Sequence, residues 1–215
     1  MTKLLVATGW GPASAKVVNL DNSNPNLTCE QLPALPFSTF TATGQLYNRK
    51  YPIMCERLYC NCLWFEDGAW KQIQSLNECR DGPASAVFPN PNNGEEDILL
   101  VTGGTNGASL ALSTVESFDG KLWDQTMFAD LPTTIAYHCL VKISDTMLFQ
   151  IGGTIDDTFP GTTGSTNFLD IIQNKWIPGP QLNVGRNRHS CGVMNWINPG
   201  SGKEEKVSNH FKYIN

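Results

Sequence analysis

The chain has 215 residues, of which 40% are hydrophobic and 16% are charged, and its formal net charge is −5. This length is sufficient for one or two domains with a buried core, and the acidic balance gives no electrostatic reason to bind nucleic acid. No apolar run reaches the roughly eighteen residues of a membrane span, so we expect no membrane insertion. The 19 glycines and 13 prolines favour short strands joined by many turns.

The first predicted strand lies at the start of the chain. Leu4–Ala7 are apolar and are followed by Thr8, Gly9 and Trp10. This run is too short for the apolar part of a signal peptide, so we interpret it as a strand. A second strand is expected over Val17–Asp21, and Cys29 follows where later units have tryptophan.

The second unit follows the same plan in a degraded form. A strand is expected over Tyr51–Glu56, with Cys55 and Glu56 where later units have two glycines. Phe65–Trp70 then matches Phe118–Trp123 of the third unit position for position.

The third and fourth units show the repeat most clearly. Ile98–Gly104 and Met147–Gly153 are β-prone runs that end in Gly-Gly, 49 residues apart. An apolar strand, a polar turn and a tryptophan follow in each unit. A further strand is expected to open each unit from the second onwards, over Thr41–Leu46, Ala84–Phe88, Tyr137–Ile143 and His189–Met194. The markers of the repeat are Gly103, Gly104, Gly152, Gly153, Trp70, Trp123 and Trp176.

Four strands per unit at a period of about fifty residues are the signature of propeller blades. We therefore predict an all-β fold, a β-propeller of about four four-stranded blades plus the start of a fifth, which forms a partial ring. The repeats are expected at roughly 1–36, 37–79, 80–132, 133–182 and 183–198, before an irregular C-terminal tail at 199–215.

Gly-Gly, an acidic turn and a tryptophan before Leu-Pro resemble kelch repeats, over residues 4 to about 194. Arg186–Cys191 also resembles the Arg-x-x-His opening of a kelch unit. The resemblance implies a kelch-type propeller with interaction loops on one face. Arg186 and Arg188 are the candidate partner contacts at the mouth of the propeller.

The tail has two interpretations. Lys206-Val207-Ser208 is what a common splice-donor string encodes, which suggests translated intron, and the alternative is a genuine short terminus. A fragment of a ring would have an open blade edge, through which it could self-associate.

The seven cysteines indicate where the chain resides. Cys60 and Cys62 lie on one face of a strand and Cys55 on its neighbour, so we expect a disulfide from Cys55 to Cys60 or to Cys62. Buried free thiols are the competing interpretation. Asn26 begins an Asn-Leu-Thr glycosylation sequon, and together these features favour a secreted or extracellular location over a cytoplasmic one.

Other polar clusters are better explained by structure than by chemistry. His138 and His189 occupy equivalent repeat positions, and no Cys/His spacing matches a metal site, so we expect neither metal nor cofactor. Gly161–Ser165 lacks the Lys-Ser/Thr ending of a phosphate-binding loop, and Asp156-Asp157 is interpreted as a solvated turn.

The function expected from these features is a non-catalytic interaction module that binds a protein or peptide through inter-strand loops on one propeller face. The first alternative is a propeller enzyme of the sugar-oxidase or sugar-mutarotase type. The second is a truncated isoform or gene fragment without independent function.

Overall fold

The structure is a computed structural model that describes residues 3–7, 14–19, 29–37, 42–56, 60–155, 161–194, 196–197 and 204–205. These residues form strands, turns and irregular segments, without a helix. The first sheet contains β1 (Lys3–Ala7), β2 (Ala15–Asn19) and β3 (Cys29–Gln31). The second contains β4 (Thr43–Tyr47), β5 (Tyr51–Cys55), β6 (Cys62–Glu66) and β7 (Ala69–Ile73).

The third sheet contains β8 (Ala84–Pro89), β9 (Asp97–Thr102), β10 (Val115–Phe118) and β11 (Trp123–Asp124). The fourth contains β12 (Cys139–Ser144), β13 (Met147–Ile151), β14 (Thr166–Asp170) and β15 (Lys175–Pro178). A last pair joins β16 (Trp196–Ile197) to β17 (Glu204–Glu205). We call the four larger sheets blades I to IV.

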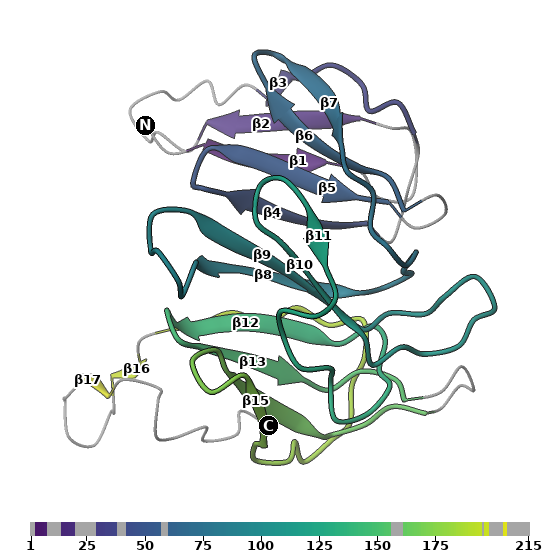
Figure 1. Cartoon of the computed structure of the whole chain (residues 1–215), viewed down its shortest axis with the longest axis vertical. Helices are drawn as coiled ribbons and strands as arrows, with labels where there is room; N and C mark the ends of the chain where they lie inside the picture. Colours follow the sequence, from purple (N-terminus) through teal and green to yellow (C-terminus); the bar gives the residue numbers. More distant parts are fainter. Residues whose placement is uncertain are drawn as a thin grey trace.

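Within each blade, every strand pairs antiparallel with the next strand in sequence. Figure 1 shows the blades one after another in chain order, from purple to green. The first strands of blades II to IV lie side by side, because β4 contacts β8 and β8 contacts β12. This arrangement of successive meander sheets is that of a β-propeller, so the predicted all-β propeller fold is confirmed.

Three of the four predicted opening strands are present, as β4, β8 and β12. The strand predicted over His189–Met194 is wrong, because these residues are described and belong to no strand. A strand needs a ladder partner, and β12 has one in β13, whereas the described residues provide none for 189–194. The tail predicted to be irregular contains β17, and Lys206–Asn215 lie outside the described residues.

The Gly-Gly pairs lie where the backbone of the next unit crosses the end of a strand. Gly103 and Gly152 both have a φ of 57°. A Cβ on Gly103 would lie 2.3 Å from the Ile135 carbonyl oxygen, and one on Gly152 would lie 2.5 Å from that of Arg186. Both the left-handed backbone and the close crossing therefore require glycine.

Each repeat tryptophan connects its blade to the one before. The indole N–H groups donate to backbone carbonyl oxygens, Trp70 to Pro33 at 3.0 Å, Trp123 to Gln74 at 2.9 Å and Trp176 to Ala129 at 2.9 Å. Trp123 and Trp176 are buried. The tryptophans thus supply apolar area between blades and a hydrogen bond that fixes the blade register.

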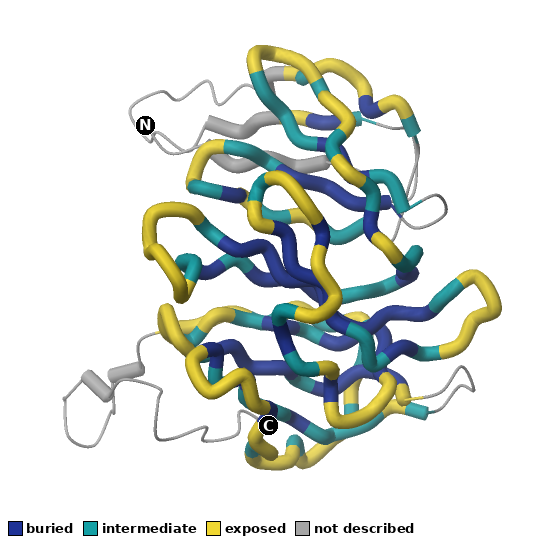
Figure 2. The backbone as a smooth tube through the Cα atoms, in the orientation of Figure 1, coloured by how far each residue is buried: buried dark blue, intermediate teal, exposed yellow. Residues whose placement is uncertain are grey.

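The core lies between the blades. One apolar cluster joins blades III and IV, with Phe88, Ile98 and Leu148 fully buried, and a second joins blades II and III around Tyr47 and Phe118. Figure 2 shows buried residues along the strands and exposed residues at the turns on either side. Packing face to face is therefore what buries the two sides of each sheet.

Three disulfides join six of the seven cysteines. Cys55 bonds Cys62, directly opposite it on the neighbouring strand, which is one of the two pairings left open above. Cys60 bonds Cys79, and Cys139 of β12 bonds Cys191. The last bridge ties the segment after blade IV to the first strand of that blade.

Candidate functional site

The candidate site lies where the opening segments of successive units meet. Gly82, Tyr137 and Arg188 occupy the same position in three consecutive units. All three have a left-handed backbone, with φ of 59°, 53° and 51°. The Tyr137 N–H donates to the Gly82 carbonyl at 2.8 Å, and the Arg188 N–H donates to the Tyr137 carbonyl at 2.8 Å. These bonds form a short ladder that runs from blade to blade.

The ladder favours glycine, yet two of its three members carry large side chains. A left-handed residue with a side chain costs about 1–2 kcal/mol, and such strain clusters at functional sites. Blade III avoids the cost with Gly82, whereas the next two units accept it. The strain that Tyr137 and Arg188 introduce at this position therefore indicates that their side chains have a function.

The two side chains stack on each other. The Arg188 guanidinium carbon lies 4.4 Å from the centre of the Tyr137 ring, a cation–π contact. The Tyr137 hydroxyl donates to the Asp81 carboxylate at 3.2 Å, and its ring covers Gly82. Arg188 is exposed. The stack thus holds an arginine in a defined direction at the surface, which lowers the entropy that binding would cost.

The structure places both predicted contact residues, Arg186 and Arg188, in exposed positions of one segment. Asn187 between them donates from Nδ2 to the Thr154 hydroxyl at 2.6 Å and so fixes the segment on blade IV. Sequence reasoning missed Tyr137 as a site residue. Its only sequence signal is that a bulky residue stands at a position of the repeat where blade III has glycine.

Exposed aliphatic side chains accompany this site on the loops. Leu110 is 63% exposed, Ile155 47% and Val184 66%. They belong to connections β9–β10, β13–β14 and the segment after β15. In an antiparallel meander these connections leave on the same side, opposite to hairpins such as β8–β9, as Figure 1 shows for the two turns of β9. We call this side the loop face.

His138 and His189 lie beneath the loop face, packed against glycines of the preceding unit. The His138 Nε2 is 2.8 Å from the Thr102 hydroxyl, and a Cβ on Gly103 or Gly152 would lie 2.9 or 3.1 Å from the Cε1 of His138 or His189. Burial lowers the pKa of His138 to about 3, with His189 acting in the same direction, and burial also lowers the pKa of His189. The buried ring of His138 and the partly buried ring of His189 agree with the structural role expected for both.

These shifts predict that stability decreases in mild acid. The unfolded chain binds a proton at His138 below about pH 6.5, whereas the folded chain does not until about pH 3. Stability is therefore complete above pH 6.5 and falls below it, by about 1.4 kcal/mol for each pH unit from this residue alone. Urea unfolding between pH 7 and pH 5 measures the slope. His138→Gln should reduce it, and an unchanged slope in this variant would contradict the assignment.

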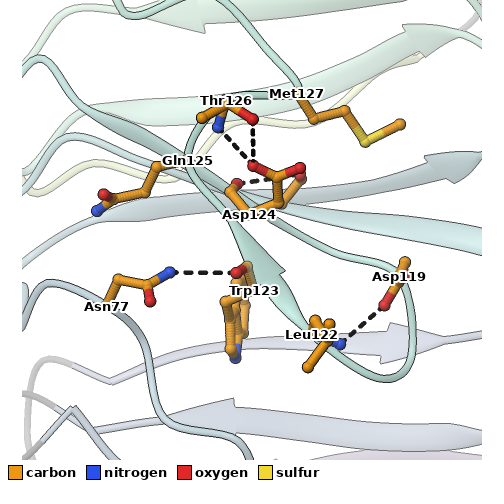
Figure 3. Close-up of a pocket in the computed structure, with 9 residues that line it drawn as sticks. Asn77, Asp119, Leu122, Trp123, Asp124, Gln125, Thr126 and Met127 are labelled. Atoms are coloured by element: carbon orange, nitrogen blue, oxygen red, sulfur yellow. Dashed lines mark hydrogen bonds between the residues drawn. The ribbon is translucent and has the colours of Figure 1, made fainter.

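A second candidate is a pocket of about 450 Å³ at the outer edge of blade III (Figure 3). It is lined around Trp123 by the β10–β11 turn and the segment after β11. Its carboxylates serve local turns: Asp119 accepts from the Leu122 N–H, and Asp124 accepts from the N–H and hydroxyl of Thr126. These bonds lower the pKa of Asp124. The carboxylates of the pocket therefore stabilise their own turns and do not converge on a common point as reactive groups would.

Other candidates from the sequence fall in different places. Asn26 and Asp156-Asp157 lie outside the described residues. Gly161–Ser165 forms part of the β13–β14 connection, where Thr163 and Ser165 bond each other. In the part of the chain that the structure describes, no three His, Cys, Asp or Glu side chains group as metal ligands, and no helix could span a bilayer.

Comparison with known proteins shows the fold of the chain but not its family or function. No protein-family model and no curated protein matches the chain. Among solved structures, the chain is similar to the structure of YjhT, with a TM-score of 0.66 and 14% sequence identity. The match covers 86% of this chain and 64% of YjhT, so the chain spans less than two thirds of that protein. At this identity the likeness shows the fold, a β-propeller.

Proposed function

We propose that this chain is a kelch-type propeller that binds a protein or peptide partner through its loop face, without catalysis. The observation that carries the proposal is the stacked pair of Tyr137 and Arg188, two strained residues on a backbone position that suits glycine. Arginine and tyrosine are enriched among residues that dominate binding energies. The exposed aliphatic side chains of the neighbouring loops supply the apolar area that such an interface needs.

The proposal includes a location outside the cytoplasm. Three disulfides persist most readily in an oxidising environment, and here they join two neighbouring strands, two connecting segments, and a connecting segment to a strand. We therefore propose a secreted or extracellular binding module.

Arg188→Gly separates binding from folding. Glycine relieves the left-handed strain but removes the cation–π contact, so the free energy of unfolding should stay within about 1 kcal/mol of the wild type. The same variant should lose its partner. Binding is measured by affinity capture from extracellular fluid with mass spectrometry, followed by titration of the purified candidates.

Arg49→Gly is the matched control. Arg49 is also an exposed arginine with a positive φ, of 53°, but it lies in the β4–β5 hairpin on the opposite side. A partner retained by the wild type and Arg49→Gly, but not by Arg188→Gly, supports the proposal. Equal retention by all three proteins would overturn it.

A further inference from the structure

The chain contains two Asn-Gly pairs, one on each side of β9. Asn93-Gly94 lies in the β8–β9 hairpin, and Asn106-Gly107 lies in the β9–β10 connection on the loop face. An asparagine side chain is attacked most easily by the chain itself when glycine follows, because glycine has no Cβ to shield its backbone nitrogen. The attacking atom is this nitrogen, and the attacked atom is the asparagine Cγ. The two pairs therefore offer one reaction in two environments.

The two asparagine side chains are held in similar ways. The Asn93 Oδ1 accepts from the Glu95 N–H at 3.1 Å, and the Asn106 Oδ1 accepts from the Ala108 N–H at 3.0 Å. Each side-chain carbonyl is thus folded back over the glycine that follows it. At Asn106 a second donor, the Leu110 N–H, reaches the same oxygen at 3.1 Å. Two backbone donors on one carbonyl oxygen stabilise the negative charge that develops there when its carbon is attacked.

The two glycine nitrogens differ in their hydrogen bonds. The Gly94 N–H donates to the Asn90 carbonyl at 2.7 Å, whereas the described residues provide no acceptor for the Gly107 N–H. An amide nitrogen must give up its proton to act as a nucleophile, and a hydrogen bond to a carbonyl opposes this loss. Asn93 is exposed and Asn106 only partly exposed, so exposure alone favours reaction at Asn93. The hydrogen bonds favour the opposite order.

We propose that Asn106 is a self-modification site of the loop face, at which the Gly107 nitrogen initiates conversion of the side-chain amide to a carboxylate. The nitrogen bonds to the Asn106 Cγ, the bond from Cγ to Nδ2 breaks, and Nδ2 leaves as ammonia with the proton that the Gly107 nitrogen has lost. The product is a cyclic imide. Water then opens the imide at either of its carbonyls, so one water is consumed for each ammonia released and no oxidant or cofactor takes part.

Both products add a negative charge to the connection that carries the exposed Leu110. Opening at Cγ gives an ordinary aspartate, which still accepts from the Ala108 and Leu110 N–H groups and so retains the loop. Opening at the backbone carbonyl gives the isomer in which the chain runs through the side chain, which lengthens the loop by one methylene group. A partner that contacts Leu110 meets either change. This last consequence rests on the proposed function, whereas the reaction itself does not.

Incubation of the intact, oxidised protein at mildly alkaline pH and body temperature tests the proposal. Cleavage after glutamate then places the two sites in separate fragments, since Glu95 and Glu96 lie between them. Tandem mass spectrometry locates the mass gain that results when the amide nitrogen is replaced by oxygen. We expect Asn106 to convert about tenfold faster than Asn93, the ratio that corresponds to one hydrogen bond on the attacking nitrogen. In reduced, urea-unfolded protein the two rates should be similar, because both sets of hydrogen bonds are lost.

Gly107→Ala is the matched variant. A Cβ at Gly107 meets no atom within 4 Å, so the fold is retained, but the methyl group shields the attacking nitrogen. Conversion at Asn106 should fall severalfold in this variant, and conversion at Asn93 should keep its rate. Equal rates at the two sites of the folded protein, faster conversion at Asn93, or an unchanged rate at Asn106 in Gly107→Ala would overturn the proposal. Because the readout is a mass and needs no partner, this test and that of the loop face fail independently.

Discussion

Arg80→Ala is expected to lower the free energy of unfolding by about 3–5 kcal/mol, the usual cost of breaking a buried ion pair from one side. Arg80 and Glu116 both have fully buried side chains, 3.0 Å apart. The Glu116 carboxylate would keep its bonds from the N–H groups of Asn77 and Glu78 but lose the only cation it contacts among the described residues. The carbonyls of Gly103 and Thr114 would lose donors as well.

Urea unfolding of the oxidised protein at pH 7 measures this effect. Arg186→Ala is the matched control, because Arg186, like Arg80, stands two residues before a member of the left-handed ladder but is exposed. This variant should change the free energy of unfolding by less than about 0.5 kcal/mol. If the two variants lose equal stability, the buried pair of Arg80 and Glu116 does not contribute the free energy of unfolding that its geometry implies.

Gly103→Ala should destabilise the chain by about 3 kcal/mol or more. The methyl group would lie 2.3 Å from the Ile135 carbonyl oxygen and 2.9 Å from the His138 ring, and the backbone would remain left-handed. Left-handed strain alone costs about 1–2 kcal/mol, and moving the backbone of the next unit adds to it. Because Ile135 opens blade IV, the damage should reach the contact between blades.

Gly107→Ala is the comparison within the same connection. A Cβ on Gly107 meets no atom within 4 Å, and its φ lies outside the left-handed range. This variant should be neutral or slightly more stable, since alanine restricts the unfolded chain. Thermal unfolding followed by circular dichroism distinguishes the two glycines, and similar midpoints would show that the crossing can relax around a methyl group.

The sequence predicted the blades well because their spacing is set by local signals. Strands β9 and β13 are apolar runs that end in Gly-Gly, and Trp123 and Trp176 follow at fixed distances. The strand predicted over His189–Met194 was wrong for a non-local reason. Its residues resemble those of β12, but a ladder depends on a partner that no local pattern reveals.

The candidate site was predictable only in part. Arg186 and Arg188 stood out as charges near the opening of a unit, and both are exposed. Tyr137 did not, because its importance comes from its backbone conformation and from a stack with a residue 51 positions later. The bridges from Cys60 to Cys79 and from Cys139 to Cys191 were missed for the same reason, as each joins segments brought together only by the fold.

The tryptophan bonds between blades have a consequence for the order of assembly on the ribosome. Each indole donates to a carbonyl that lies 37 to 49 residues earlier in the chain. The acceptor has therefore always been synthesised before its donor, and each new blade can dock on the one before as soon as its tryptophan emerges. The growing propeller thus presents a finished template to every blade that follows, and assembly proceeds from the N-terminus in steps of one repeat.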